Sequence, residues 1–194
     1  NVLDLFSGIG GFSLGLERAG MRTVAFCEIE PFPRAVLAKH WPGVPCYHDI
    51  HEVTADRLGR DGIGRIDLVS GGYPCQPFSH AGKQGGADDP RHLWPQMRRV
   101  IGEVRPAWVL AENVAGHITL GLDQVLADLE ADGYAGRAIV VPACAKDAPH
   151  IRQRLWIMAR DRDRDRESAC AVNDEAQGVP SIVADSDRSR LEGR

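Results

Sequence analysis

The sequence lacks the segments that direct a protein to a membrane or out of the cell. Over its 194 residues no apolar run approaches the length of a bilayer-spanning helix, and no secretory leader opens the chain. Internal repeats are missing too, and 43% hydrophobic and 26% charged residues are ordinary for a globular domain. We therefore expect a cytoplasmic protein with one sizeable core and no membrane partner.

Cysteine is sparse and scattered. The chain holds five cysteines with no CxxC spacing, which argues against a disulfide framework and a structural zinc site. The histidines His40, His48 and His51 match no metal-ligand pattern, so we predict no bound metal.

Excess charge is missing as well. The formal net charge is −4, so the chain as a whole does not attract a polyanion. Any nucleic-acid binding must come from a local basic face.

Apolar runs alternate with helical patterns along most of the chain. Strands are predicted over residues 1–6, 23–27, 66–70 and 108–111, with a short strand allowed inside the loop 42–49. Helices are predicted over 12–19, 31–40 and 93–103, with an apolar helix face over 122–129. The segment 56–64 is rich in glycine and charge and is interpreted as a connection.

This alternation predicts an α/β fold with a mostly parallel sheet. Two late strands, 138–141 and 155–159, have no helix between them, so they are expected to form an antiparallel hairpin at the sheet edge. The run RDRDRDRE at 160–167 cannot bury a face. We predict a domain over 1–160, followed over 161–194 by a charged, poorly ordered linker and the start of another region.

The stretch GGYPCQPFS, residues 71–79, places one thiol after a buried strand. Cys75 lies between Pro74 and Pro77, and a residue that precedes proline is kept out of the helical region. The loop should therefore present Cys75 at the carboxyl end of a strand, where open α/β sheets bind ligands. The alternative is a buried apolar cysteine. A nucleophilic Cys75 would need a polarising neighbourhood or a proton acceptor.

The turn SGIGG, residues 7–11, follows the first strand and opens a helix. Its glycines let the backbone approach a ligand, and the helix N-terminus offers N–H groups to an anion such as a carboxylate. The spacing differs from GxGxxG, so a pyrophosphate is less favoured. Glu28 ends the second strand and can accept hydrogen bonds from ribose hydroxyls, and Asp49 can meet an adenine amino group. Together these features suggest an adenosyl ligand, although each alone is common in turns and at strand ends.

Two further groups lie near the same predicted edge. Glu112 follows the strand next to that of Cys75 and can share its pocket, unless it is a helix cap or a surface acid. Arg152 and Arg154 are spaced to leave one face of a strand, or to form a solvated basic edge.

The motifs DLFSGIGGF, GGYPCQPFS, ENV and RQRLWIMA, in this order over residues 1–160, resemble those of the cytosine-specific DNA methyltransferases that modify carbon 5. The resemblance implies a Rossmann-like S-adenosylmethionine-dependent methyltransferase fold, double-stranded DNA as the partner, and a flipped-out target base. It implies that Cys75 adds to carbon 6, that Glu112 holds a proton at ring nitrogen 3, and that Arg154 with Arg152 binds the exocyclic oxygen or a nearby phosphate. It implies a cofactor site lined by Phe6, Gly8, Ile9, Gly11, Glu28, Ile29, Asp49, Ile50, Pro74 and Leu93.

The resemblance also assigns residues 79–91 to a mobile loop that closes over DNA. DNA contacts are expected from Gln76, Ser79, Lys83 and Arg91, the last two through phosphates. The family's target-recognition region, a further strand and a closing helix are not recognisable here. The chain is therefore interpreted as a catalytic-domain piece, either a fragment of a longer enzyme or one half of a split enzyme whose second chain supplies these parts. Intrinsic sequence specificity should be low.

Three other functions remain open at this stage. A related enzyme would methylate cytosine in tRNA with the same scaffold, although QPFSHAGKQ after Cys75 looks more like the DNA enzymes. The chain could instead be a silent subunit of a split methyltransferase that binds donor or DNA. A generic Rossmann oxidoreductase with a structural cysteine would bind a nicotinamide cofactor.

Overall fold

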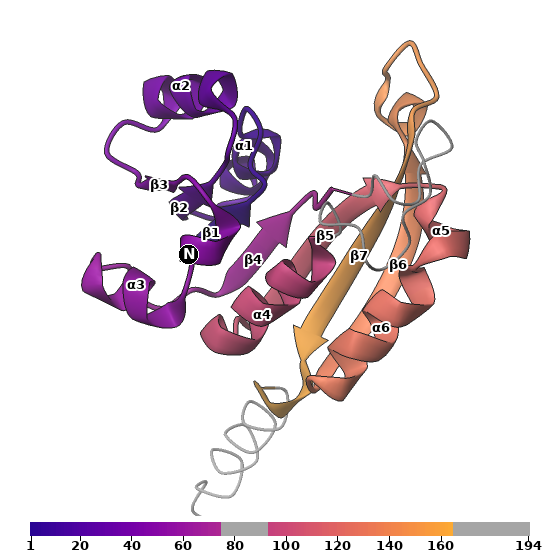
Figure 1. The fold of residues 1–194 in the computed structure, drawn as a ribbon. Helices are drawn as coiled ribbons and strands as arrows, with labels where there is room; N and C mark the ends of the chain where they lie inside the picture. The colour runs from indigo at the N-terminus through magenta and orange to yellow at the C-terminus, as the bar shows by residue number, and fades with distance from the viewer. Residues whose placement is uncertain (75–92, 165–194) are drawn as a thin grey trace, which may run out of the picture. The chain divides into compact units, whose positions relative to one another are not determined.

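The computed structural model describes residues 1–74 and 93–164. Within these residues seven strands form one sheet in the order β3-β2-β1-β4-β5-β7-β6 (Figure 1). The strands are β1 (Val2–Leu5), β2 (Thr23–Cys27), β3 (Cys46–Tyr47), β4 (Leu68–Gly71), β5 (Trp108–Val114), β6 (Tyr134–Pro142) and β7 (Gln153–Asp161).

Strands β1 to β5 pair in parallel, whereas β7 pairs antiparallel with both β5 and β6. The predicted α/β class and the late antiparallel hairpin at the sheet edge are confirmed. Strand β1 lies between β2 and β4, so the order of the strands reverses beside it. Such a reversal opens a crevice at the carboxyl ends of the strands.

Six α-helices connect the described strands: α1 (Gly11–Arg18), α2 (Pro31–His40), α3 (Ala55–Arg60), α4 (Trp94–Val104), α5 (His117–Leu120) and α6 (Leu122–Ala131). Helices α4 and α6 contact each other and lie over one face of the sheet (Figure 1). Because parallel crossovers are right-handed, α1, which leads from β1 toward β2, lies on the other face.

Two local predictions were wrong and one short helix was missed. The segment 56–64 contains helix α3, whose first turn is capped by the Thr54 side chain accepting a hydrogen bond from Arg57 N. The short helix α5 was not expected. Strand β5 runs to Val114, so Glu112 lies inside the strand and not after it; its backbone is paired with that of Trp156 on β7.

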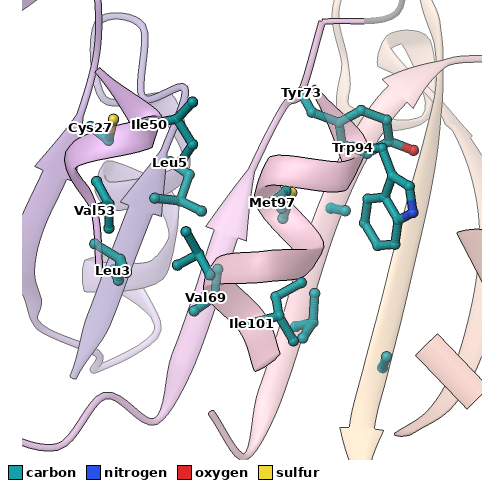
Figure 2. Close-up of a cluster of buried hydrophobic side chains, with 14 of the residues drawn as sticks. Leu3, Leu5, Cys27, Ile50, Val53, Val69, Tyr73, Trp94, Met97 and Ile101 are labelled. Carbon is teal, nitrogen blue, oxygen red and sulfur yellow. The ribbon is translucent and has the colours of Figure 1, made fainter. Parts of the chain in front are cut away.

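Helix α4 supplies the centre of the core. Figure 2 shows Met97 and Ile101 beside Val69 of β4, and all three side chains are fully buried. Burying a side chain of this size contributes about 1.5–3 kcal/mol, so this contact fixes the position of β4 firmly. In the sequence, β4 ends at Gly71, shortly before Cys75.

One buried carboxyl group joins the first strand to the elements around it. Asp4 of β1 is fully buried, and its two oxygens accept hydrogen bonds from Ser13 Oγ of α1 at 2.8 Å and Ser70 Oγ of β4 at 2.7 Å. Burial raises the pKa of Asp4 to about 7, and the two hydroxyl donors only partly oppose this. Asp4 therefore connects the helix after the glycine turn to the strand that precedes Cys75.

We expect the stability of this domain to fall as pH rises from about 4 to about 8, through the raised pKa of Asp4. Below pH 4 the carboxyl is protonated in both states, whereas between pH 4 and 7 only the unfolded chain releases the proton. The fall should reach about 4 kcal/mol at most, since one pKa unit corresponds to about 1.4 kcal/mol. Urea unfolding of wild type and Asp4→Asn at each pH measures it as the difference between the two curves, which cancels the titration of other groups. Parallel curves would contradict the assignment.

Candidate active site

A pocket of about 510 Å³ lies at the carboxyl ends of β1, β2, β3 and β4. Seven of the predicted cofactor residues line it: Phe6, Glu28, Ile29, Asp49, Ile50, Pro74 and Leu93. The structure thus brings together residues that are up to 87 positions apart in the chain, namely Phe6 and Leu93. Its volume falls within the range of small-molecule sites, roughly 300–1,000 Å³.

Glu28 lines the pocket and also accepts two backbone hydrogen bonds. Its Oε2 accepts the backbone N–H of Gly8 at 2.7 Å, and its Oε1 accepts the backbone N–H of Glu30 at 2.8 Å. The carboxylate therefore holds the glycine turn against the end of β2. Each carboxylate oxygen has a further lone pair, so Glu28 can still accept from a ligand hydroxyl.

Asp49 also lines the pocket and lies just before the 3-10 helix η1 (Ile50–Glu52). Its Oδ1 accepts from the backbone N–H of His51 at 2.9 Å and is 2.7 Å from His51 Nδ1. These contacts, with the backbone bond as the larger cause, hold the pKa of Asp49 below its usual range. Asp49 is thus an ionised acceptor at neutral pH.

None of the glycine-turn residues 7–11 lines this pocket. Gly8 reaches it only through its hydrogen bond to Glu28, while Ile9 and Gly11 line a separate hollow between α1 and α2. Gly8 and Gly10 have φ angles of +52° and +87°, where glycine is favoured. A side chain at Gly10 would also meet the ring of Trp41, because an added Cβ would lie 2.5 Å from it.

Glu112 and Arg154 form an ion pair across β5 and β7, with Arg154 Nε 2.7 Å from Glu112 Oε1. Burial raises the pKa of Glu112, while Arg154 and Arg152 act in the opposite direction. A Cβ added at Gly72 would lie 3.1 Å from Glu112 Oε2, so Glu112 touches a residue that lines the pocket. The predicted proximity of Glu112 to the β4 edge is therefore present.

Arg152 is placed differently from Arg154. It precedes β7, is exposed and has a φ of +30°, so of the two arginines only Arg154 lies in the strand. The charges of both arginines nevertheless lower the pKa of Glu112. Phe6, at the pocket, also has a positive φ, +51°. Non-glycine residues in this region cost free energy and cluster at functional sites.

Five predicted residues, Cys75, Gln76, Ser79, Lys83 and Arg91, lie outside the described residues. The pocket also includes residues that were not predicted: Cys27, Glu30, His48, His51 and Gly72. Their positions next to Glu28, Asp49 and Pro74 in the sequence were the available signal. No group of three or more metal-ligating side chains occurs within 1–74 and 93–164. In the same ranges no helix is both long and apolar enough to cross a bilayer.

Comparison with known proteins identifies the group to which the chain is related. The family model for C-5 cytosine-specific DNA methylases matches residues 1–187. The chain belongs to this family. Within this family it is 44% identical over 163 residues to the type II methyltransferase M.NgoMIV of Neisseria gonorrhoeae, covering 81% of this chain and 50% of that protein. It is 36% identical over 170 residues to M2.BsuMI of Bacillus subtilis, covering 81% and 41%.

Solved structures agree with this family and fold. A prophage-encoded protein of E. coli described as a DNA modification methyltransferase superposes with a TM-score of 0.73 at 30% identity, covering 85% of this chain and 47% of that one. The Dnmt2 methyltransferase of S. pombe superposes with a TM-score of 0.67 at 25% identity, covering 82% and 50%. The chain therefore spans half or less of the length of these family members.

Proposed function

We propose that this chain carries out methyl transfer from S-adenosylmethionine to carbon 5 of cytosine in double-stranded DNA, through a covalent adduct with Cys75. The observation that carries the proposal is the contact between Glu112 and Gly72. This contact places Glu112 next to the donor pocket, because Gly72 lines the pocket. Gly72 is three residues before Cys75 in the sequence. Family membership supports the same chemistry.

The pocket fits S-adenosylmethionine in its donor set and its size. Glu28 offers carboxylate oxygens to ribose hydroxyls, and Asp49 offers one to the adenine amino group. Ile29 and Ile50 provide apolar walls for the adenine ring. When bound, the cofactor supplies an electrophilic methyl group on a sulfonium sulfur.

The residues around the base would make carbon 5 reactive. Carbon 5 of cytosine is a weak nucleophile, so the Cys75 thiolate first forms a bond to carbon 6 and gives the ring enamine character. A hydrogen bond from protonated Glu112 to ring nitrogen 3 takes up the charge that develops. After carbon 5 has gained the methyl group, a base removes its proton and the bond between Cys75 and carbon 6 breaks, which restores the ring and the thiolate.

Arg154 is placed to act on both the acid and the base. Its guanidinium contacts Glu112 and so fixes the direction of the carboxyl group. Its remaining N–H groups can donate to the exocyclic oxygen of cytosine. Arg152, exposed and with a strained backbone, is assigned to the base or to a neighbouring phosphate.

The substrate is duplex DNA from which the target cytosine is flipped out, because a base stacked inside the duplex cannot reach an active-site pocket. We assign Gln76, Ser79, Lys83 and Arg91 to DNA contacts, as the family resemblance implies.

A further stretch of polypeptide, from a continuation of this chain or from a second chain, is proposed to complete the enzyme. On the sheet face opposite α6, Trp108 of β5, Met158 of β7 and Ile139 of β6 remain exposed among the described residues. Sheets of this class are normally covered on both faces. The length that the relatives have beyond the matched region is sufficient to supply a target-recognition region and a covering helix.

The decisive experiment is a covalent trap. Duplex DNA with 5-fluorocytosine at target positions is incubated with the chain and S-adenosylmethionine, with and without a complementing C-terminal chain, and adducts are counted on a denaturing gel. Fluorine cannot leave carbon 5 as a proton does, so we expect the protein to stay attached to DNA.

The control arms separate the alternatives. Absence of any adduct, even with the complementing chain, would refute the enzyme hypothesis for this polypeptide. Adducts on 5-fluorocytosine tRNA but not on DNA would favour the tRNA enzyme. Thermal shift by S-adenosylhomocysteine is expected and by NAD is not, since only a ligand of the folded state raises the melting temperature.

A further inference from the structure

The chain leaves β4 through a residue that is held at three points. Tyr73 is 3% exposed, and its hydroxyl lies 2.8 Å from Nε2 of His117, the first residue of α5. Its ring packs against Trp94 of α4, with 5.3 Å between the ring centroids. Its carbonyl oxygen accepts a hydrogen bond from Asn113 Nδ2 of β5 at 3.2 Å. Three different elements thus fix the side chain and the backbone of one residue.

The partners of Tyr73 are themselves confined. His117 is 1% exposed, and a Cβ added at Gly121 would lie only 2.6 Å from its ring, so the imidazole fills the space that the missing side chain leaves. Trp94 Nε1 donates to Asp128 of α6 at 2.8 Å. The Asn113 side chain accepts the backbone N–H of Val114 at 2.8 Å, which orients its amide nitrogen toward Tyr73. Each partner of Tyr73 is thus held by a further contact of its own.

We propose that Tyr73 and His117 are a pair of positioning residues that hold the end of β4, so that the thiol two residues later meets Glu112 and the donor pocket. The chain reaches at most about 7 Å over two residues, so fixing Tyr73 restricts where Cys75 can lie. Gly72 and Pro74, on either side of Tyr73, both line the pocket. This inference rests on the proposed function, because it assigns the nucleophile to Cys75.

The pair acts on the rate of adduct formation and not on donor binding. Tyr73 and His117 do not line the donor pocket, whose acids Glu28 and Asp49 lie just after β2 and just before η1. A 1 Å displacement of a reacting group can lower the reaction rate by about 10²-fold. One lost hydrogen bond lowers the free energy of unfolding by only about 1 kcal/mol, so the domain should stay folded. A positioning role therefore predicts a change in the chemical step with little change in donor affinity.

The test uses single-turnover adduct formation on 5-fluorocytosine DNA, together with hydrogen exchange of the peptide that contains residues 71–76. In Tyr73→Phe we expect adduct formation about tenfold slower, exchange of this peptide about tenfold faster, and S-adenosylhomocysteine affinity within about twofold of wild type. His117→Leu should have an equal or larger effect, and His117→Gln, which keeps a polar nitrogen, should recover most of the rate. The double variant Tyr73→Phe with His117→Leu should be no slower than His117→Leu alone, because the two residues act as one unit.

Tyr134→Phe is the matched control. Tyr134 is fully buried, and its hydroxyl donates to Pro106 O at 2.8 Å, far from the pocket in the sequence and at the start of β6. Its loss should lower stability without slowing adduct formation or exposing residues 71–76. Equal effects from Tyr134→Phe and Tyr73→Phe, or unchanged exchange of residues 71–76 in Tyr73→Phe, would overturn the proposal. If wild type forms no adduct, the proposed function fails, while the exchange data still decide whether the pair holds the end of β4.

Discussion

Replacing Cys75 by serine is expected to abolish methyl transfer and leave donor binding intact. A serine hydroxyl is far less acidic than a thiol, so it cannot add to carbon 6 at neutral pH. Loss of a covalent nucleophile costs on the order of 10³-fold or more in rate. Transfer of labelled methyl groups to duplex DNA and titration with S-adenosylhomocysteine measure the two effects separately.

Cys144→Ser is the control for this substitution. Cys144 is an exposed free thiol in the connection between β6 and β7, so its loss should leave the rate unchanged. A Cys75→Ser variant that no longer binds donor would contradict the separation between the nucleophile and the donor pocket. A variant that still methylates DNA at the wild-type rate would refute the covalent mechanism.

Glu112→Gln is expected to lower the rate of methyl transfer by about 10²- to 10⁴-fold, the usual contribution of a positioned acid. The amide can no longer deliver a proton to ring nitrogen 3. Because burial raises the pKa of Glu112, the wild-type enzyme keeps the protonated form to a higher pH than an exposed glutamate would. The wild-type rate should therefore fall as pH rises through this pKa, and that limb of the pH–rate profile should be missing in Glu112→Gln.

Glu103→Gln provides a matched comparison. Glu103 of α4 pairs with Arg99 at 2.7 Å, the same separation as the pair of Glu112 and Arg154, but lies outside the donor pocket. The Glu103 variant should retain full activity. If both variants lose the same fraction of activity, the effect belongs to protein stability and not to a proton at the base.

The elements that surround the pocket could be predicted from the sequence because they depend on local signals. Apolar runs locate β1, β2 and β4, and acids at strand ends identify Glu28 and Asp49 as pocket residues. Parallel pairing then brings these positions to one edge without any knowledge of side-chain packing. The antiparallel hairpin could also be predicted, because no helix separates its two strands.

Other features depend on contacts that no local pattern encodes. Helix α3 has a single buried residue, Leu58, so it has almost no apolar periodicity to detect. The length of β5 is set by pairing with β7, which places Glu112 inside the strand. The contact between Tyr73 and His117 joins residues 44 positions apart through a short helix that was not predicted. Tertiary packing, and not propensity, determines all three.

The hydrogen bond between Glu28 and Gly8 limits how the donor pocket can be redesigned. The carboxylate that is expected to recognise the sugar also holds the first turn of the backbone in place. Enlarging the pocket for an analogue with a modified sugar by shortening Glu28 would release that turn at the same time. Engineering for synthetic donors should therefore begin at Ile29, an exposed residue of the pocket wall, and not at Ile50, which is 5% exposed and belongs to the hydrophobic core.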